Sequence, residues 1–523
     1  MFYQKMLGKI HAQRLIKMAF SLRPESELLI YNGQRLTRRQ VFANIQALGG
    51  GLQSLGIGMG DRVVTLLPAC PEAVYAMFLP EMIGSVHVPL NPLLSERELV
   101  HILKDCGAQA VVTAQRFFGQ DYPAMLERLR PELPDLRTVI VVNATQGDGQ
   151  LFYALDELLA WGKRLSSQRL SAEDVALVTY TSGTTGLPKG VMHSLQRLFS
   201  LVSPHLDLSL VRCLLLPFPP YQIGGMLGIV GALISGGKII LMDTFDPVQM
   251  LEAIQNERVS QVAGSPTMYR LMLMALEKRP FDLSSLRRVT FSTEPCPHEL
   301  ARTIHERFNC NLENIYATTE SLIISWTGLQ DDWEIAAITV GKAAPGVRVR
   351  IVDDQRQPLP VGERGEIAVQ TSQMMLGYYH DPDLSAQVLD ADGWFYTGDI
   401  GVQDEEGYLR LVDRKKDLII RGGQNIFPAE VEAWLETHSC VRRAAVVGIP
   451  HPLAGEAIWA FLELQPGATL TAREVLSHCR GQMAPFKIPE QVRLLNQLPV
   501  TAIGKIQKFT LRELALQELN RDK

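Results

Sequence analysis

A segment rich in glycine and hydroxyl groups, with one lysine, lies between two apolar runs of the sequence. It reads YTSGTTGLPKGVMHS (180–194), and the strand-like run LVTY leads into it. Glycine permits positive φ and a close backbone approach, so successive N–H groups can converge on an anion. The glycines are Gly183, Gly186 and Gly190, the hydroxyl residues include Ser182, Thr184 and Thr185, and the positive charge is that of Lys189. The pattern predicts a cradle for phosphate.

The spacing differs from that of a Walker A loop. That motif requires GxxxxGK[ST], whereas Pro188 stands five residues after Gly183 and is followed by Lys189 and Gly190. Another kind of nucleotide chemistry is indicated. The alternative reading, a flexible Gly/Thr turn at the surface, would suit a shorter segment better than this one.

The whole segment resembles the phosphate-binding signature of the adenylate-forming superfamily, which includes acyl-CoA synthetases, luciferases and the adenylation domains of peptide synthetases. Four further segments resemble elements of this family and occur in its order. They are IYATTES (315–321), GWFYTGDIG (393–401), LVDRKKDLIIRGGQNIFPAEVE (411–432) and LPVTAIGKIQK (498–508). The resemblance covers nearly the whole chain and is strongest to an acid–CoA ligase.

This resemblance implies an enzyme with ATP, Mg²⁺ and coenzyme A as its cofactors and cosubstrates. A carboxylate would react with ATP to give an acyl-AMP and pyrophosphate, and the acyl group would then pass to the CoA thiol. A medium-chain, aryl or specialised carboxylic acid is the expected substrate. The alternative is a stand-alone adenylating ligase that loads the phosphopantetheine of a carrier protein or couples the acyl group to an amine.

The resemblance also implies a site with cations and oriented donors where charge accumulates on the reacting phosphate. The implied catalytic residues are Lys505, Thr184 and Glu320, and Glu320 is also the implied magnesium ligand. The implied nucleotide-binding residues are Thr181, Ser182, Gly183, Thr185, Lys189, Tyr316, Thr319, Asp399 and Arg414. Asp399 would accept hydrogen bonds from the ribose hydroxyls, and Lys505 would bridge the attacking carboxylate and the α-phosphate.

A change of position between the two reaction steps is a further implication. Polarity rises abruptly at residues 413–416, which predicts a hinge between an N-terminal adenylation domain (1–412) and a mobile C-terminal domain (417–523). Rotation about Lys416 would exchange the Lys505 loop for a loop containing Gly422 and Gly423. Adjacent glycines suit the wall of a narrow tunnel for the pantetheine arm of CoA.

The expected acid pocket departs from the common family pattern. Its implied residues are Gln222, Gly224, Thr293, Glu294 and Ala317. Gln222 stands where many relatives have a histidine, and an amide cannot titrate as imidazole does. Side chains at 292–294 and Ala317 replace small residues, which is expected to narrow or polarise the pocket. Glu294 either meets a cation or a polar ligand group, or faces solvent after a small shift in alignment.

Alternating helical and strand-like segments predict an α/β fold with buried parallel strands. We expect a large N-terminal domain of α/β subdomains plus a small β-barrel-like subdomain, followed by a small mobile α+β C-terminal domain. The apolar run MLGIVGALI (226–234) suits either a core helix, which is favoured, or the wall of a site for an apolar acid.

The composition excludes several classes of function. The 523 residues carry a net charge of −5, without the basic field that gathers nucleic acid. The seven cysteines form no CxxC pair and suit packing as free thiols in a reducing compartment. No apolar run is long enough for a transmembrane segment. We expect a cytoplasmic monomer or homodimer whose basic first segment is a packed helix, with a membrane-surface helix or an organelle address as the alternative.

Overall fold

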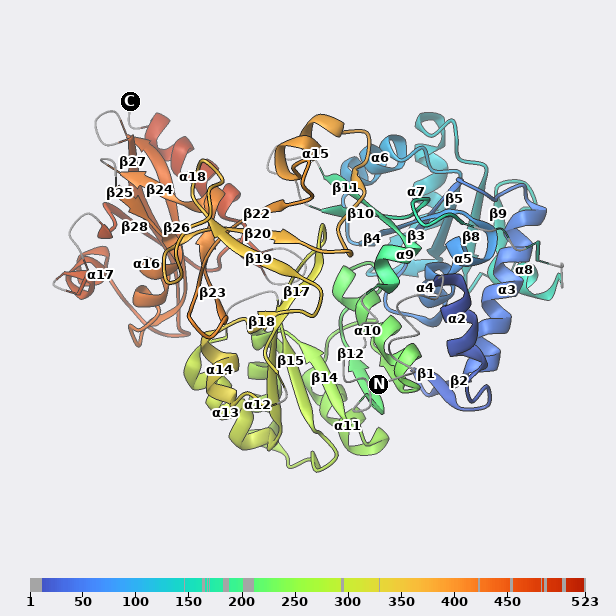
Figure 1. Ribbon diagram of the computed structural model, residues 1–523, viewed down its shortest axis with the longest axis horizontal. Coiled ribbons are helices and arrows are strands. Elements are labelled where there is room, and N and C mark those ends of the chain that lie inside the picture. Colours follow the sequence, from blue (N-terminus) through green and yellow to red (C-terminus); the bar gives the residue numbers. More distant parts are fainter. Residues whose placement is uncertain are drawn as a thin grey trace. The chain divides into compact units, whose positions relative to one another are not determined.

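The computed structural model of the chain divides into two compact units (Figure 1). The first comprises Met1–Val349 and Val369–Phe395, and the second comprises Arg350–Ala368 and Tyr396–Lys523. The described residues are 12–144, 146–161, 165, 166, 168, 170–181, 188–200, 211–292, 296–328, 330–421, 424–451, 455–480, 482, 483, 487–500 and 505–521. The expected fold class, a large α/β part followed by a small α+β part, is confirmed.

The first unit contains an eight-stranded sheet with the order β21-β11-β10-β4-β3-β5-β8-β9. Its strands are β3 (Arg62–Leu66), β4 (Val86–Leu90), β5 (Ala110–Ala114), β8 (Thr138–Val142), β9 (Phe152–Ala154), β10 (Val175–Thr181), β11 (Lys189–Ser194) and β21 (Gly377–Tyr378). The strands from β10 to β9 pair in parallel, whereas β11 pairs antiparallel with β10 and with β21. The central strands are buried and rich in valine, as expected for a parallel sheet covered on both faces.

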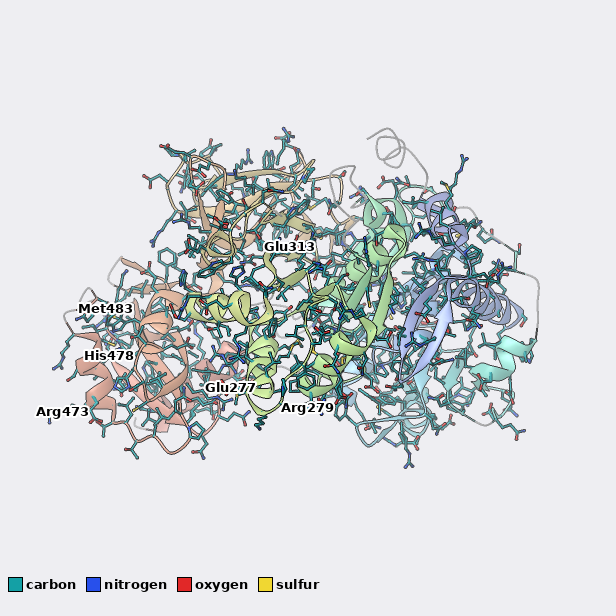
Figure 2. All side chains as sticks on the ribbon, turned by 90° about the horizontal axis from the view of Figure 1, so that it is seen from below. Glu277, Arg279, Glu313, Arg473, His478 and Met483 are labelled. Carbon is teal, nitrogen blue, oxygen red and sulfur yellow. The ribbon has the colours of Figure 1, made fainter. Side chains whose placement is uncertain are left out.

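The first unit also contains a nine-stranded sheet with the order β18-β17-β16-β15-β14-β12-β13-β1-β2. Its strands are β1 (Glu27–Tyr31), β2 (Gln34–Thr37), β12 (Cys213–Leu216), β13 (Lys238–Leu241), β14 (Gln261–Gly264), β15 (Arg288–Phe291), β16 (Asn311–Thr318), β17 (Leu322–Trp326) and β18 (Lys342–Ala343). Buried Glu313 on β16, labelled in Figure 2, accepts from Thr290 Oγ1 at 2.9 Å and lies 3.4 Å from Arg288 Nη1. These cross-strand contacts compensate the charge of a carboxylate inside the sheet.

Helices connect the strands of both sheets, in the alternation that the sequence predicts. They are α2 (Ala12–Ser21), α3 (Arg38–Ser54), α4 (Pro71–Met77), α5 (Leu79–Ile83), α6 (Glu96–Asp105), α7 (Tyr122–Leu129), α8 (Leu155–Ala160), α9 (Leu195–Phe199), α10 (Ile223–Ser235), α11 (Pro247–Glu257), α12 (Pro266–Lys278), α13 (His298–Phe308), α14 (Trp333–Ile338) and α15 (Pro382–Val388), with a 3₁₀ turn at Arg130–Glu132 and a short hairpin of β6 (Arg116–Phe117) and β7 (Gln120–Asp121). Thr37 caps the start of α3, because its side chain accepts from Gln40 N and the Gln40 side chain accepts from Thr37 N.

A fully buried arginine joins three helices of the first unit. The guanidinium of Arg38, at the start of α3, donates to Ala19 O on α2 at 3.2 Å. It also donates to Leu233 O at 2.9 Å and to Gly237 O at 2.8 Å, at the carboxyl end of α10. Carbonyls at a helix end have no partner within the helix and carry a partial negative charge, so they suit a buried cation. Arg38 thereby fixes the far end of α10.

The second unit begins with the sheet β19-β20-β22-β23. Its strands are β19 (Arg348–Val352), β20 (Gly365–Gln370), β22 (Phe395–Gln403) and β23 (Leu409–Arg414). Strands β22 and β23 pair antiparallel. A 3₁₀ turn at Lys415–Asp417 follows.

The remainder of this unit is a sheet with helices on its two faces. Its elements are β24 (Ile419–Arg421), β25 (Gln424–Ile426), α16 (Pro428–Leu435), β26 (Val441–His451), β27 (Gly455–Leu464), α17 (Ala472–Cys479), β28 (Gln491–Leu495) and α18 (Lys508–Arg521). Successive residues of β26 alternate between two cores: Val446 packs with residues of α16 and α17, and Val447 packs with residues of α18. This alternation is the period of a strand that is buried on both faces.

Two expectations from composition agree with the structure. All seven cysteines are free, and six of them are buried, which confirms their packing role. Within the described part of the chain, no helix is long and apolar enough to cross a membrane. The apolar face of α2, with Leu15, Ile16 and Phe20, is buried against the first unit.

Glu81 on α5 is a buried acid with no compensating group. Neither carboxylate oxygen meets a hydrogen-bond partner among the described residues. Burial raises the pKa of Glu81 to about 9, and the weaker effect of Lys17 opposes this rise. The carboxyl group is therefore protonated at neutral pH in the folded protein.

This burial predicts a pH-dependent stability that Glu81→Gln removes. The folded-state pKa exceeds the unfolded value of about 4.3, so stability falls as the pH rises between these values, by up to ~1.4 kcal/mol per unit. The free energy of unfolding is measured with urea at about pH 6 and about pH 8. Between these two values it should fall by roughly 2 kcal/mol more in the wild type than in the variant. Equal losses in the two proteins would contradict a protonated Glu81.

Candidate active site

The predicted phosphate segment connects two antiparallel strands. Thr181 at the end of β10 and Lys189 at the start of β11 are register partners, so their backbones lie side by side where the connection leaves the sheet. Ser182, Gly183, Thr184 and Thr185 lie outside the described residues, and their roles stay predictions.

The expectation that the glycines of this segment adopt a positive φ is wrong at Gly190. It lies within β11, paired with Tyr180, and has an ordinary φ. A Cβ on Gly190 would lie 2.8 Å from Val178 Cγ1 and 3.1 Å from Tyr379 Cβ. Close packing inside the sheet is therefore the physical reason for glycine at this position.

The second predicted element forms the turn between β16 and β17. Tyr316 is buried on β16, a bulge separates it from Ala317, and Thr319 and Glu320 follow the end of the strand. Thr318 Oγ1 accepts from Ser321 N at 3.1 Å across this turn. Leu322, the first residue of β17, has a φ of +57°, a left-handed conformation that is strained for leucine.

Three contacts from outside the turn hold Thr319 and Glu320. Buried His193 on β11 donates from Nε2 to Thr319 O at 2.7 Å. The amide of Met375 donates to Glu320 O at 2.6 Å. Tyr378 on β21 donates from its hydroxyl to Glu320 Oε1 at 2.9 Å. The backbone of the turn and one oxygen of its carboxylate are thus fixed before any ligand binds.

The protonation states of these partners suit their roles as donors. Burial, together with Glu320, raises the pKa of Tyr378, so the phenol keeps its proton. Burial lowers the pKa of His193 to about 4, and the bond to Thr319 opposes this shift. The imidazole is therefore neutral, and its single N–H points to the Thr319 carbonyl.

A cation completes this group. Lys189 Nζ lies over the ring of Tyr378, 5.5 Å from its centroid. The phenol thus contacts both the ammonium of Lys189 and the carboxylate of Glu320, which come from two separate predicted elements far apart in the sequence. A site with a fixed carboxylate and a nearby ammonium can bind the metal and the phosphate oxygens of a nucleotide together.

Arg197 on α9 supports the segment that carries Met375 and Tyr378. Its Nη1 donates to Met374 O at 2.7 Å and to Met375 O at 2.9 Å. Its Nη2 donates to Glu173 Oε2 at 2.8 Å, which compensates part of the charge. The segment before β21 is therefore held in register with β11.

In the second unit, Asp399 and Arg414 form the pair that the resemblance implies for ribose. They are cross-strand partners on β22 and β23, and Arg414 Nε lies 3.2 Å from Asp399 Oδ1. The Asp399 side chain is 10% exposed, whereas that of Arg414 is 48% exposed. A carboxylate so placed can accept hydrogen bonds from two neighbouring hydroxyls.

The backbone before Asp399 is tightly fixed. Gly398 has a φ of +72°, which favours glycine, and its N–H donates to Glu366 Oε1 at 2.9 Å. The Asp399 amide donates to Thr397 Oγ1 at 3.1 Å. Lys415 Nζ lies 3.0 Å from Glu366 Oε2, so this buried carboxylate is paired with a cation.

The predicted hinge and the predicted catalytic lysine both lie in the second unit. Lys416 lies in the 3₁₀ turn after β23, and Asp413 just before it accepts from Ala429 N at 2.9 Å. Lys505 is exposed, one residue before the bridge that joins Ile506 to Val500. Gly422 and Gly423 lie outside the described residues.

The expected acid-binding residues are only partly described. Gln222 is the N-cap residue of α10, without a side-chain cap bond, and Gly224 is exposed with open space where a Cβ would stand. At Gly225 a Cβ would lie 2.2 Å from Pro219 O, so the sterically required glycine is Gly225. Thr293 and Glu294 lie outside the described residues.

Sequence reasoning missed the residues that support the site. His193, Arg197, Tyr378 and the strained Leu322 carry no local signal of their role. His193 closes the phosphate segment in the sequence, but nothing local indicates that it meets a turn 126 residues away.

The donor set fits magnesium bound together with a nucleotide. No cluster of three or more His, Cys, Asp or Glu side chains that could hold a metal ion occurs among the described residues. Mg²⁺ is commonly held by one or two carboxylates together with substrate phosphates, and Glu320 offers such a carboxylate. Magnesium would supply charge neutralisation for the phosphates at this position.

Comparisons with known proteins agree with this geometry. The family described as AMP-binding enzyme matches residues 17–379, and the AMP-binding enzyme C-terminal domain matches residues 430–505. The medium-chain acyl-CoA ligase ACSF2, mitochondrial, of Macaca fascicularis is 34% identical, over 95% of this chain and 86% of the relative.

Two solved structures are similar over nearly the whole chain. The anthranilate CoA ligase AuaEII in complex with anthranoyl-AMP has a TM-score of 0.87 and 26% identity, over 98% of each chain. The amide bond synthetase McbA from Marinactinospora thermotolerans has a TM-score of 0.83 and 28% identity, over 96% of this chain and 100% of its own. The chain therefore belongs to the AMP-binding enzyme family, and within that family to the ATP-dependent acid–CoA ligases.

Proposed function

We propose that this protein activates a medium-chain carboxylic acid with Mg·ATP and transfers the acyl group to coenzyme A. In the first step a carboxylate oxygen attacks the α-phosphorus, and the bond to pyrophosphate breaks. In the second step the CoA sulfur attacks the acyl carbon, the bond to AMP breaks, and the thiol proton passes to solvent. The fixed group of Lys189, Tyr378 and Glu320, on a chain matched by the AMP-binding family, carries this proposal.

The first unit would bind the phosphates. Lys189 would contact phosphate oxygens, with donors from the connection between β10 and β11 that includes Ser182, Thr184 and Thr185. Glu320 would hold Mg²⁺ through the oxygen that Tyr378 does not contact, and Thr319 would add a hydroxyl donor. Because the Thr319–Glu320 turn is held by His193 and Tyr378 before ATP binds, little reorganisation of this turn accompanies charge development.

The second unit would bind the ribose and deliver the reacting cation. Asp399 would accept from the ribose hydroxyls, and Arg414 would contact the ribose or a phosphate. Exposed Lys505 would bridge the carboxylate and the α-phosphate in the first step. Rotation about Lys416 would then replace it with Gly422 and Gly423, beside the pantetheine arm.

The acceptor is the least constrained part of this proposal. The medium-chain relative is named as a CoA ligase, and a similar structure is named as an amide bond synthetase. Sequence identity favours the CoA ligase, because ACSF2 is 34% identical to this chain and the amide bond synthetase is 28% identical. A carrier-protein thiol or an amine is the second candidate.

A matrix of acids and acceptors tests the proposal. Purified protein is mixed with Mg·ATP and each member of a panel of aliphatic and aromatic acids, and pyrophosphate release is recorded. Each acid that supports release is then tested with CoA, holo-carrier protein and simple amines, and the thioester or amide is measured by mass spectrometry. We expect CoA thioesters from medium-chain acids; adenylation without any CoA thioester would refute CoA as the acceptor.

The two-position mechanism predicts that two substitutions have opposite effects. Lys505→Ala should slow acyl-AMP formation at least about a hundredfold, the scale for losing one charge-stabilising group, and spare thioester formation from supplied acyl-AMP. Gly423→Leu should block the pantetheine path and spare adenylation. Pyrophosphate exchange and thioester yield measure the two steps, and a parallel loss of both in Lys505→Ala would argue against rotation.

His193 should act as a positioning residue for the Thr319–Glu320 turn. His193→Leu leaves the Thr319 carbonyl without its donor, which costs about 1–3 kcal/mol in a buried setting. We expect pyrophosphate release to slow about tenfold or more, with the KM for Mg·ATP raised because the turn is less fixed. His193→Gln, which can donate to the same carbonyl, should recover part of the rate. A purely structural role would lower thermal stability and leave the kinetics of the folded enzyme unchanged.

A further inference from the structure

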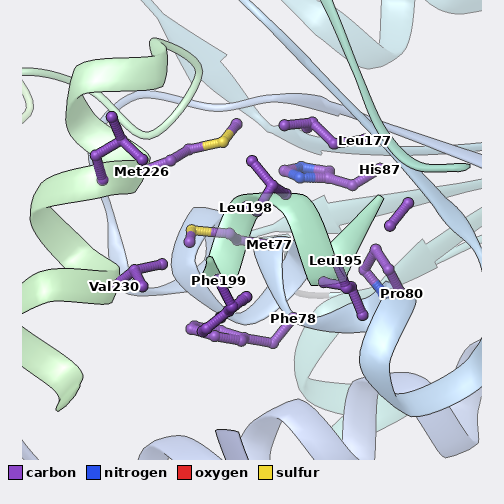
Figure 3. Close-up of a pocket in the computed structure, with 12 residues that line it drawn as sticks. Met77, Phe78, Pro80, His87, Leu177, Leu195, Leu198, Phe199, Met226 and Val230 are labelled. Carbon is purple, nitrogen blue, oxygen red and sulfur yellow. The ribbon is translucent and has the colours of Figure 1, made fainter. Parts of the chain in front are cut away.

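A small apolar cavity, about 20 Å³ in volume, lies within the first unit (Figure 3). It is bounded by residues of α4, α5, β4, β10, α9 and α10. The residues that line it are Met77, Phe78, Pro80, His87, Ala176, Leu177, Leu195, Leu198, Phe199, Met226, Leu227 and Val230. His87 is the one polar side chain among these described residues.

His87 points into this cavity from β4, toward Leu198 and Met226 (Figure 3). Its side chain is buried, and Nε2 lies 3.1 Å from Thr65 Oγ1 on β3. Its other nitrogen, Nδ1, meets no hydrogen-bond partner among the described residues. Burial lowers the pKa of His87 to about 3, so the ring is neutral. Thr65 can either donate to Nε2 or accept from it, so Nδ1 can serve as donor or as acceptor.

The cavity adjoins the elements that carry the active-site residues. Helix α10 starts directly after Gln222, and Met226 follows one turn later, about 6 Å along the axis. Helix α9, which supplies Leu195 and Leu198, directly follows β11 and therefore Lys189. The first turn of α10 thus connects Gln222, an expected acid-binding residue, with the wall of this cavity.

An unpaired nitrogen in an apolar cavity is unfavourable unless a ligand atom pairs with it. A water molecule there would meet one polar side chain, fewer than the roughly two to four partners that buried waters take. A purely hydrocarbon chain would leave Nδ1 unpaired. An oxygen atom on an otherwise apolar chain would pair with the nitrogen, and the flexible side chains of Met77 and Met226 can adjust around it.

We propose that this cavity receives the far end of the acyl chain, and that His87 Nδ1 hydrogen-bonds a hydroxyl or keto oxygen carried there. This inference rests on the proposed function and narrows it: the substrate class is a medium-chain acid with an oxygen function near the end opposite its carboxylate. A cavity of about 20 Å³ admits only the terminal, oxygen-bearing group of the chain, and His87 selects the oxygen. His87 is thus a specificity-determining residue.

The test compares matched pairs of acids with the wild-type protein. Each straight-chain acid from hexanoic to dodecanoic is paired with its terminal hydroxy and its penultimate keto counterpart, and kcat/KM is measured from pyrophosphate release. At one chain length, the oxygenated acid should be preferred over its parent by at least about tenfold, the scale for the net contribution of one hydrogen bond.

Variants separate recognition from cavity shape. His87→Leu should abolish the preference for the oxygenated acid, because kcat/KM for the parent acid rises relative to that for the oxygenated acid. His87→Asn should keep part of this preference, because its amide can still form a hydrogen bond. Leu198→Ala is the matched control, because it enlarges the same cavity: it should move the preferred chain length and keep the preference for oxygen. Thermal unfolding of each variant identifies any loss that comes from misfolding.

The outcomes are distinct. A wild type that treats the members of every pair equally would overturn the inference while leaving the proposed function intact, as would a His87→Leu variant that keeps the preference. If no acid of any kind supports pyrophosphate release by the wild type, the proposed function fails and the inference fails with it. If His87→Leu and His87→Asn both misfold, the wild type is compared with Leu198→Ala instead. Loss of the preference for the oxygenated acid in Leu198→Ala would assign that preference to the shape of the cavity and overturn the role of His87.

Discussion

The candidate site depends on a short polar turn that is fixed from behind by buried hydrogen bonds. Thr319 and Glu320 leave a strand edge where their backbone has few partners of its own, and contacts from His193 and Tyr378 supply them. Each donor is buried and keeps its proton at neutral pH. A turn held in this way can present a carboxylate to a metal-bound nucleotide without first having to be ordered by it.

Buried and exposed charged side chains differ in the partners that they meet. Buried charges of both units are paired, as with Arg38 at the end of α10 and Glu366 beside Lys415. More exposed charges, such as Lys505 and Arg414, lie where a mobile anionic ligand can reach them. Burying an unpaired charge is costly, so interior charges need fixed partners, whereas exposed charges can exchange a protein partner for a ligand.

The interior of the first unit contains buried polar side chains as well as apolar ones. Most of its core is aliphatic and close-packed, and the paired Arg288 and Glu313 are compensated. Glu81 and His87 are among the side chains with a buried polar atom that has no partner among the described residues. Glu81 lies in a setting that keeps it protonated, whereas His87 faces a cavity, and only a cavity can admit a partner from outside.

The sequence alone determined the classes of the elements and which short motifs resemble a known family. Period-two and period-3.6 patterns, N-caps such as Thr37 and glycine-rich connections are local, so the α/β alternation could be predicted. Asp399, Glu320 and Lys189 could be proposed as site residues because their implied roles are tied to short motifs. Only the tertiary structure decided that His193 meets Thr319 and that Tyr378 joins Lys189 to Glu320. Residues far apart in the chain meet only through sheet order and register, and no local pattern encodes such distant partners.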